Sequence, residues 1–88
     1  MKNVKQLFGT VSLINTTTEI IAILTDDGEY SITEMFDEVG LTLGDRVSGS
    51  LEELGEIILT NHTTRMSGKV WINDVGLDRQ TAIQALKG

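Results

Sequence analysis

The chain has 88 residues and a formal net charge of −6, which is the size of one small domain. It has no cysteine, so a disulfide framework and a thiolate metal site are excluded, and a reducing, cytoplasmic setting is favoured. No stretch approaches the ~20 consecutive apolar residues of a membrane-spanning helix, so no membrane is expected among its partners.

The first third of the chain has the patterns of β-strands. Residues 4–14 alternate around Gly9, which predicts a long strand that bends where the side chain is missing. Residues 19–25 are an almost continuous run of mostly β-branched apolar residues, typical of a strand covered on both faces. The Asp-Asp-Gly sequence at 26–28 predicts a tight hairpin into a third strand at 29–33.

The remaining elements are shorter. Residues 34–39 lose the period of two, so we expect a short helical turn or structured loop there that closes one end of the fold. Further strands are predicted at 45–51, 56–60 and 69–73, separated by glycine-containing turns. A terminal helix is predicted at about 77–87.

We expect a single domain, because the chain has no proline, no low-complexity tract and no evident internal repeat. Residues 1–65 are predicted to form the barrel, and residues 66–88 a strand and helix packed on the same domain. Asp74 or Gly76 is the expected cap of the helix. A partial apolar stripe on this helix needs a surface to cover, and we expect it to fold back over the barrel or to dock on a second subunit.

Acidic residues dominate the middle of the chain. Between Glu19 and Glu56 there are eleven acidic residues and one basic residue, Arg46. A polyanion needs clustered lysine or arginine, so nucleic acid is disfavoured as a partner. The simpler alternative is that the acidic excess only keeps the protein in solution.

The segment 9–61 resembles a known family. Gly9, Val11 and Asn15 fall where the cold-shock domain has its opening glycine, valine and asparagine, and Gly28 has that family's spacing from the asparagine. The sequence LTLGDRV at 41–47 is similar to the start of its fourth strand. The resemblance implies a mainly β protein, a five- to six-stranded OB-like small barrel with a short C-terminal α-helix.

The residues with which that family would bind single strands are missing. Cold-shock domains stack bases on aromatic side chains, each worth ~1–3 kcal/mol, but Leu13 stands where the family has a tryptophan, and Ile20 and Ala22 lie in a stretch without aromatics. If these three side chains face outward, they form a candidate protein-interaction patch. A register shift of one residue would instead place them in the core.

Trp71 lies in the alternating strand at 69–73 and is expected to point outward, either beneath the terminal helix or into an interface. It is the fourth candidate protein-interaction residue. An alternative, nucleic-acid-binding interpretation uses the aromatic and basic residues Tyr30, Trp71, Arg65, Lys69 and Arg79.

No catalytic constellation is predicted. His62 is the only histidine and has no cysteine or recognisable nucleophile motif to pair with. The acidic pairs fall at predicted turns, and the run at 26–29 lacks the ligand spacing of a calcium loop. We therefore predict no catalytic residue, no metal site and no cofactor.

The sequence favours a non-catalytic, acidic interaction module that binds an unknown protein partner or forms a homo-oligomer. The alternative is a weak single-stranded nucleic-acid-binding protein of the cold-shock type. A helix folded over the former binding face would explain both the missing aromatics and the additional C-terminal residues.

Overall fold

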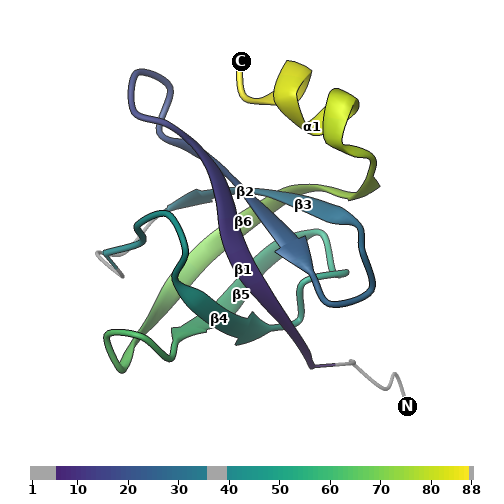
Figure 1. Cartoon of the computed structure of the whole chain (residues 1–88). Helices are drawn as coiled ribbons and strands as arrows, with labels where there is room; N and C mark the ends of the chain where they lie inside the picture. Colours follow the sequence, from purple (N-terminus) through teal and green to yellow (C-terminus); the bar gives the residue numbers. More distant parts are fainter. Residues whose placement is uncertain (1–5, 36–39, 88) are drawn as a thin grey trace.

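The computed structural model describes residues 6–35 and 40–87 as a closed barrel of six antiparallel strands followed by one helix (Figure 1). The barrel consists of β1 (Leu7–Asn15), β2 (Ile20–Thr25), β3 (Tyr30–Met35), β4 (Arg46–Gly49), β5 (Gly55–Asn61) and β6 (Met66–Leu77), and the helix is α1 (Arg79–Ala85). The mainly β class with a short C-terminal helix is confirmed. The described residues contain no helix that is long and apolar enough to cross a membrane.

Around the barrel the strands follow the order β1-β2-β3-β6-β5-β4, and β4 pairs back with β1. β6 therefore lies between β3 and β5 as a full member of the barrel. It is longer than the predicted strand at 69–73 and extends to Leu77. β4 is shorter than the predicted strand at 45–51, because it ends at Gly49.

The barrel interior is filled by one side of each strand. β1, β2, β5 and β6 alternate, so that buried aliphatic side chains point inward and their neighbours point outward. The buried core consists of Leu7, Val11, Ile21, Ile23, Val47, Leu51, Ile57, Leu59, Val70 and Ile72.

Two glycines meet backbone requirements that the sequence indicated. A Cβ at Gly9 would lie 2.7 Å from Ile23 Cγ2 and 2.9 Å from the carbonyl oxygen of Leu24, so only glycine allows β1 to pass this close to β2. Gly28 has a φ of 88°, and its amide donates to the carbonyl of Thr25 at 2.9 Å. The predicted hairpin turn is confirmed.

A buried polar cluster fixes the start of β4 against the end of β5. Asp45 Oδ2 accepts hydrogen bonds from the Thr42 amide at 3.0 Å and from Asn61 Nδ2 at 2.7 Å, and its Oδ1 accepts from the Thr42 hydroxyl at 3.0 Å. Asp45 and Asn61 are both buried. These hydrogen bonds, led by the one from the Thr42 amide, lower the pKa of Asp45 below its usual range because they favour the carboxylate.

The helix begins later than predicted. The Asp78 carboxylate accepts from the Thr81 amide at 2.8 Å and caps α1, whereas Asp74 and Gly76 lie within β6. The prediction of a cap at Asp74 or Gly76 was wrong because the strand continues past both residues. The hydrogen bond from Thr81 also lowers the pKa of Asp78. Of the predicted helical turn at 34–39, residues 34 and 35 belong to β3 and residues 36–39 lie outside the described residues.

Candidate protein-binding surface

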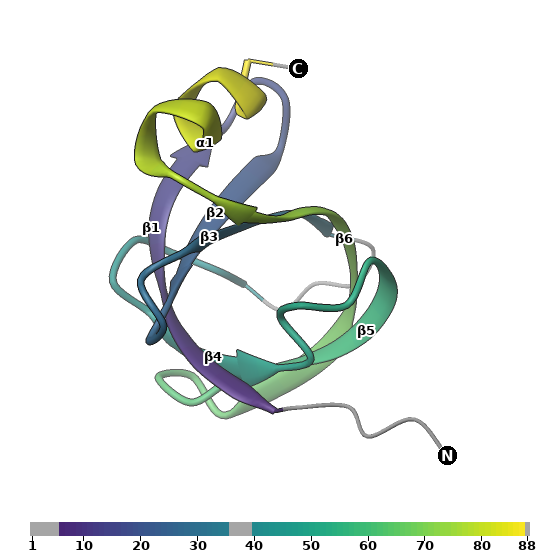
Figure 2. The ribbon, with the colours of Figure 1, turned by 90° about the vertical axis from the view of Figure 1, so that its right-hand side faces the viewer.

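The outer surface of β1, β2 and β3 is apolar and is covered by α1. We call it the covered face; its side chains are Leu13, Ile20, Ala22, Tyr30 and Ile32, and they form one cluster with Ala82 and Leu86 of the C-terminal segment. Both ribbon views place α1 beside this part of the barrel and away from β4 (Figures 1 and 2). The predicted fold-back of the helix onto its own barrel is therefore observed.

Polar contacts at both ends hold α1 in place. The carbonyl oxygen of Leu86 accepts from Nδ2 of Asn15, at the end of β1, at 2.8 Å and from the hydroxyl of Thr18, in the following turn, at 3.0 Å. Near the start of the helix, Arg79 Nη1 donates to the Tyr30 hydroxyl at 3.1 Å. These contacts satisfy a helix-end carbonyl that would otherwise lack a partner.

This arrangement changes the interpretation of three candidate residues. Ala22 is 0% exposed and Ile20 is 8% exposed, while Leu13 is partly buried against the same cluster. Of the two orientations left open for them, the structure shows the one outside the barrel interior, and α1 covers them there. A partner reaches them only if the helix moves.

Trp71 lies on the outward side of β6, next to β3, and α1 does not cover it. Its side chain is 41% exposed on the outward side of β6 and is not part of the cluster beneath α1. The register places it directly between Glu34 of β3 and Glu56 of β5. Of the two positions expected for Trp71, the one beneath the terminal helix was wrong.

The five residues of the nucleic-acid interpretation fall into two groups. Tyr30 is buried and bonded to Arg79 at the helix. Lys69 and Trp71 instead lie on the outward side of β6, and Arg65 lies in the turn that precedes it. The structure thus does not combine them into one surface.

Large apolar side chains do lie open beside Trp71. Leu54 is 64% exposed and Ile58 is 56% exposed, and Ile58 is a diagonal neighbour of Trp71 because the register pairs Ile58 with Lys69 and Glu56 with Trp71. We call this surface of β5 and β6 the open face; it comprises Leu54, Glu56, Ile58, Lys69 and Trp71. The alternation of residues 56–60 could have revealed Ile58, because it puts Ile57 and Leu59 inside.

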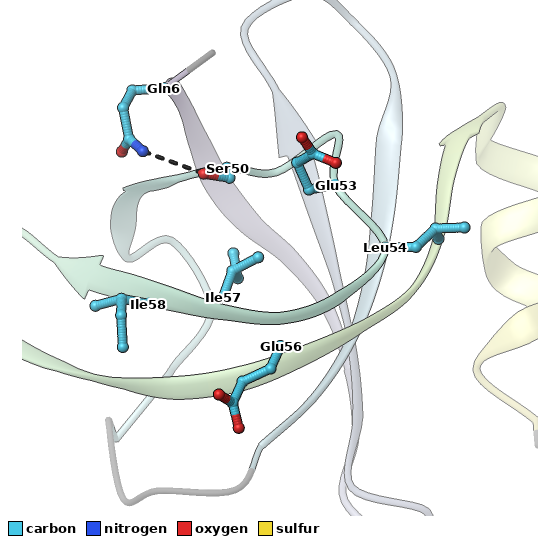
Figure 3. Close-up of a pocket in the computed structure, with 7 residues that line it drawn as sticks. All are labelled: Gln6, Ser50, Glu53, Leu54, Glu56, Ile57 and Ile58. Atoms are coloured by element: carbon cyan, nitrogen blue, oxygen red, sulfur yellow. Dashed lines mark hydrogen bonds between the residues drawn. The ribbon is translucent and has the colours of Figure 1, made fainter. Parts of the chain in front are cut away.

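A groove of about 430 Å³ adjoins the open face along the side of β5 that faces away from β6. Gln6, Ser50, Glu53, Leu54, Glu56, Ile57 and Ile58 line it (Figure 3). Ile57 points from β5 toward the loop that carries Ser50 and Glu53, while Glu56 and Ile58 point to the other side of the strand (Figure 3). Side chains from both sides of β5 contribute because β4 separates from β5 here: their pairing is confined to Val47 with Asn61 and Ser48 with Thr60.

A second exposed cluster surrounds Phe8 of β1. The Phe8 ring stacks on His62 with centroids 5.3 Å apart, and the Arg46 guanidinium lies 5.4 Å from the ring centroid. Arg46 also forms a bidentate ion pair with Asp26, at 2.8 and 2.5 Å, and this hydrogen bonding lowers the pKa of Asp26. With both partners against it, the Phe8 ring is already engaged within the chain.

His62 also contacts a hydroxyl. Its Nε2 lies 2.7 Å from Ser48 Oγ, a spacing that a nucleophile and its base would share. The pair is exposed, and no carboxylate hydrogen-bonded to His62 is found in the described part of the chain. Within residues 6–35 and 40–87 there is also no group of three or more histidine, aspartate or glutamate side chains placed to hold a metal ion.

Comparison with protein-family models, with curated proteins and with solved structures finds no match to this chain. The function must therefore be inferred from the side chains of the covered face and the open face.

Proposed function

We propose that the protein is a non-catalytic, protein-binding module and that it binds its partner through the open face. The observation that carries this proposal is the position of Ile58 and Trp71 as exposed diagonal neighbours, with Leu54 exposed immediately before β5. Exposed apolar side chains that lie together favour an interaction surface. Tryptophan is also among the residues that contribute most to binding at protein interfaces.

The charge of the chain favours a different, basic protein over a second copy. The net charge is −6, and Glu34 and Glu56 flank Trp71 on neighbouring strands. A symmetric dimer through this face would bring the same carboxylates of two acidic chains toward each other, which opposes association. A partner with lysine or arginine beside apolar residues would instead gain from the same charges.

Single-stranded nucleic acid is the less favoured ligand. Trp71 is exposed and could stack on a base, but the carboxylates of Glu34 and Glu56 beside it would repel the phosphates of the same strand. Tyr30 and Arg79, which the nucleic-acid interpretation also needs, are bonded to each other at the helix.

We also propose that the barrel is an OB-like fold related to cold-shock domains. The supporting features are the β1-β2-β3 meander, the closing pair of β1 with β4, and the glycines at positions 9, 28 and 44 in the spacing noted above. The six strands differ from the five of the usual OB-fold. In this proposal α1 has taken the place of the bound strand on the covered face, and we expect the interaction in the cytoplasm.

The proposal is tested by crosslinking from one position on each surface. A photo-reactive amino acid replaces Ile58 on the open face in one variant and Ile83, on the exposed side of α1, in a matched control. In cell extract, we expect a discrete protein adduct from position 58 and none of the same mass from position 83. An excess of unlabelled wild-type protein should abolish the adduct, and Trp71→Ala protein should compete poorly.

Other results would change the conclusion. Identical adducts from both positions would contradict binding through the open face. An adduct of twice the chain mass would show self-association instead of a separate partner. A nuclease-sensitive adduct, together with quenching of Trp71 fluorescence by mixed oligonucleotides at low salt, would favour the nucleic-acid alternative.

A further inference from the structure

We propose that the open face and the adjoining groove recognise an extended peptide segment in which a lysine or arginine lies three positions from a large apolar residue. This inference rests on the proposed function and specifies the partner's chemistry. The cation would bind at Trp71, and the apolar side chain would enter the groove beside β5.

The cation position is defined by strand register. Glu34, Trp71 and Glu56 lie side by side on β3, β6 and β5, and directly opposite residues in antiparallel strands have Cβ atoms about 4.5–5.5 Å apart. An indole face attracts a guanidinium or ammonium group, and carboxylates on both sides accept its hydrogen bonds. This combination of aromatic and acidic groups fits a cationic side chain and opposes an anionic one.

The apolar position is the groove. Ile57 forms its floor and Leu54 its end toward β6, while the bond from Gln6 Nε2 to Ser50 Oγ, 3.2 Å long, bridges β1 and the loop on the other side. A volume of about 430 Å³ is enough for one large aliphatic or aromatic side chain and part of its backbone. Polar groups of Gln6 and Ser50 at the rim suit the peptide backbone of such a segment.

The distance between the two positions sets the peptide spacing. Neighbouring strands lie about 4.8 Å apart, so the groove, one strand spacing beyond β5, lies about 10 Å from β6 and Trp71. A segment in the polyproline II conformation advances about 3.1 Å per residue and has three residues per turn, so residues i and i+3 lie on the same face and about 9 Å apart. A segment that crosses the strands would thus place residue i on Trp71 and residue i+3 in the groove.

The test uses synthetic hexapeptides and the fluorescence of Trp71, which is the only tryptophan. The reference peptide is acetylated Gly-Arg-Ser-Ser-Leu-Gly amide. Its controls replace arginine by glutamine, replace leucine by serine, or place arginine next to leucine. Up to about 5 mM peptide, we expect saturable quenching by the reference peptide and at least about five-fold weaker binding of every control.

Matched protein variants locate the two halves of the site. Glu56→Gln is expected to weaken the reference peptide about three- to five-fold and to reduce the salt dependence of binding. Leu54→Ser should weaken it by a similar factor but leave the binding of the serine-substituted peptide, which lacks the leucine, unchanged. Glu19→Gln removes the same charge from the β1–β2 turn and should change the affinity by less than about two-fold.

The outcomes separate this inference from the proposed function. Absence of quenching, equal binding of the adjacent and spaced peptides, or equal effects of Glu56→Gln and Glu19→Gln would overturn the inference. If position 58 still crosslinks a protein, the proposed function survives that result. A peptide that binds as expected while position 58 crosslinks no protein would support the recognition chemistry and contradict the proposed cellular role.

Discussion

The covered face and the open face carry similar aliphatic side chains but differ in what lies above them. On β2, Ile20 and Ala22 point away from the barrel interior and are buried beneath α1. On β5, Ile58 points outward in the same way and remains 56% exposed. Strand alternation thus determines which side chains leave the interior, while a separate element determines which of them are available for binding.

The largest expected effect on stability comes from disrupting the contact between α1 and the covered face. Ala82 is fully buried beneath the exposed side of α1, so Ala82→Asp should place a charge in an apolar contact and either unfold the protein or release the helix. We expect a loss of about 3 kcal/mol of unfolding free energy in urea titrations. Release of the helix would also increase the binding of a hydrophobic dye to the exposed covered face.

Ile83→Asp is the control, because it adds the same charge to the exposed side of the same helix. Its unfolding free energy should stay within about 0.5 kcal/mol of the wild type. Equal destabilisation by the two variants would contradict docking of α1 through Ala82.

The next largest effect is expected at the buried polar cluster that fixes β4 against β5, a strand of the open face. Asp45→Asn should cost about 1–3 kcal/mol of unfolding free energy, because a neutral amide oxygen accepts the hydrogen bonds from Asn61 and the Thr42 amide more weakly than the carboxylate does, and an NH2 group replaces the oxygen that accepts from the Thr42 hydroxyl. Glu52→Gln, in the exposed part of the following loop, is the control and should be close to neutral. A loss in Glu52→Gln as large as in Asp45→Asn would show that lost charge, and not the buried cluster, causes the effect.

The same carboxylate predicts a pH dependence. The pKa of Asp45 is lower in the folded than in the unfolded protein. The contribution of Asp45 to the free energy of unfolding is therefore fully present above the pKa of about 3.9 that an aspartate has in the unfolded protein. That contribution is lost as the pH falls through the folded pKa. The unfolding free energy of Asp45→Asn should therefore fall less steeply below about pH 4 than that of the wild type. If the unfolding free energies of the two proteins fell in parallel with pH, the pH dependence would not come from Asp45.

A smaller effect is expected where the barrel holds the end of α1. Asn15 accepts from the amides of Thr17 and Thr18 and donates to the carbonyl of Leu86. Asn15→Ala should cost about 1 kcal/mol and raise the rate of amide hydrogen exchange in α1 more than in β5. Uniformly faster exchange in both elements would indicate global destabilisation without a specific link to the helix.

The fold was largely predictable from local patterns. Alternation, the turn at Gly28 and the bend at Gly9 act through neighbouring residues, and the structure shows the corresponding strands and hairpin. The helix start was missed because Asp74 and Asp78 are both suitable caps, and only the pairing of β6 with β3 decides how far the strand continues.

A local repeat was also missed. The two hairpin turns that follow Asn15 and Asn61 share an asparagine whose Oδ1 accepts from the amides two and three residues later. Each turn also has a left-handed residue, Glu19 or Arg65, with φ near 60°. The spacing Asn-x-Thr-Thr-x is visible in the sequence, but the Asn15 amide group reaches the helix end while that of Asn61 reaches Asp45, and these partners depend on tertiary structure.

The site was less predictable than the fold. The sequence left open whether Leu13, Ile20 and Ala22 face outward or into the core, and their cover depends on contacts with residues more than fifty positions away. The open face combines side chains from β5 and β6 with a groove that exists because β4 separates from β5 after Ser48. No periodicity in a single strand encodes that separation.

Ile58→Ser has the smallest expected effect on stability and gives the sharpest test of the comparison. Ile57 and Ile58 are consecutive, but Ile57 is buried and Ile58 is exposed. Ile57→Ser should cost about 3 kcal/mol because it removes buried apolar contacts, whereas Ile58→Ser should stay within about 0.5 kcal/mol of the wild type in urea titrations. Unlabelled Ile58→Ser protein should nevertheless fail to compete for the adduct formed from position 58. If it competes as well as the wild type, the exposed isoleucine contributes nothing to binding, and the open face differs from the covered face only in lacking a helix above it.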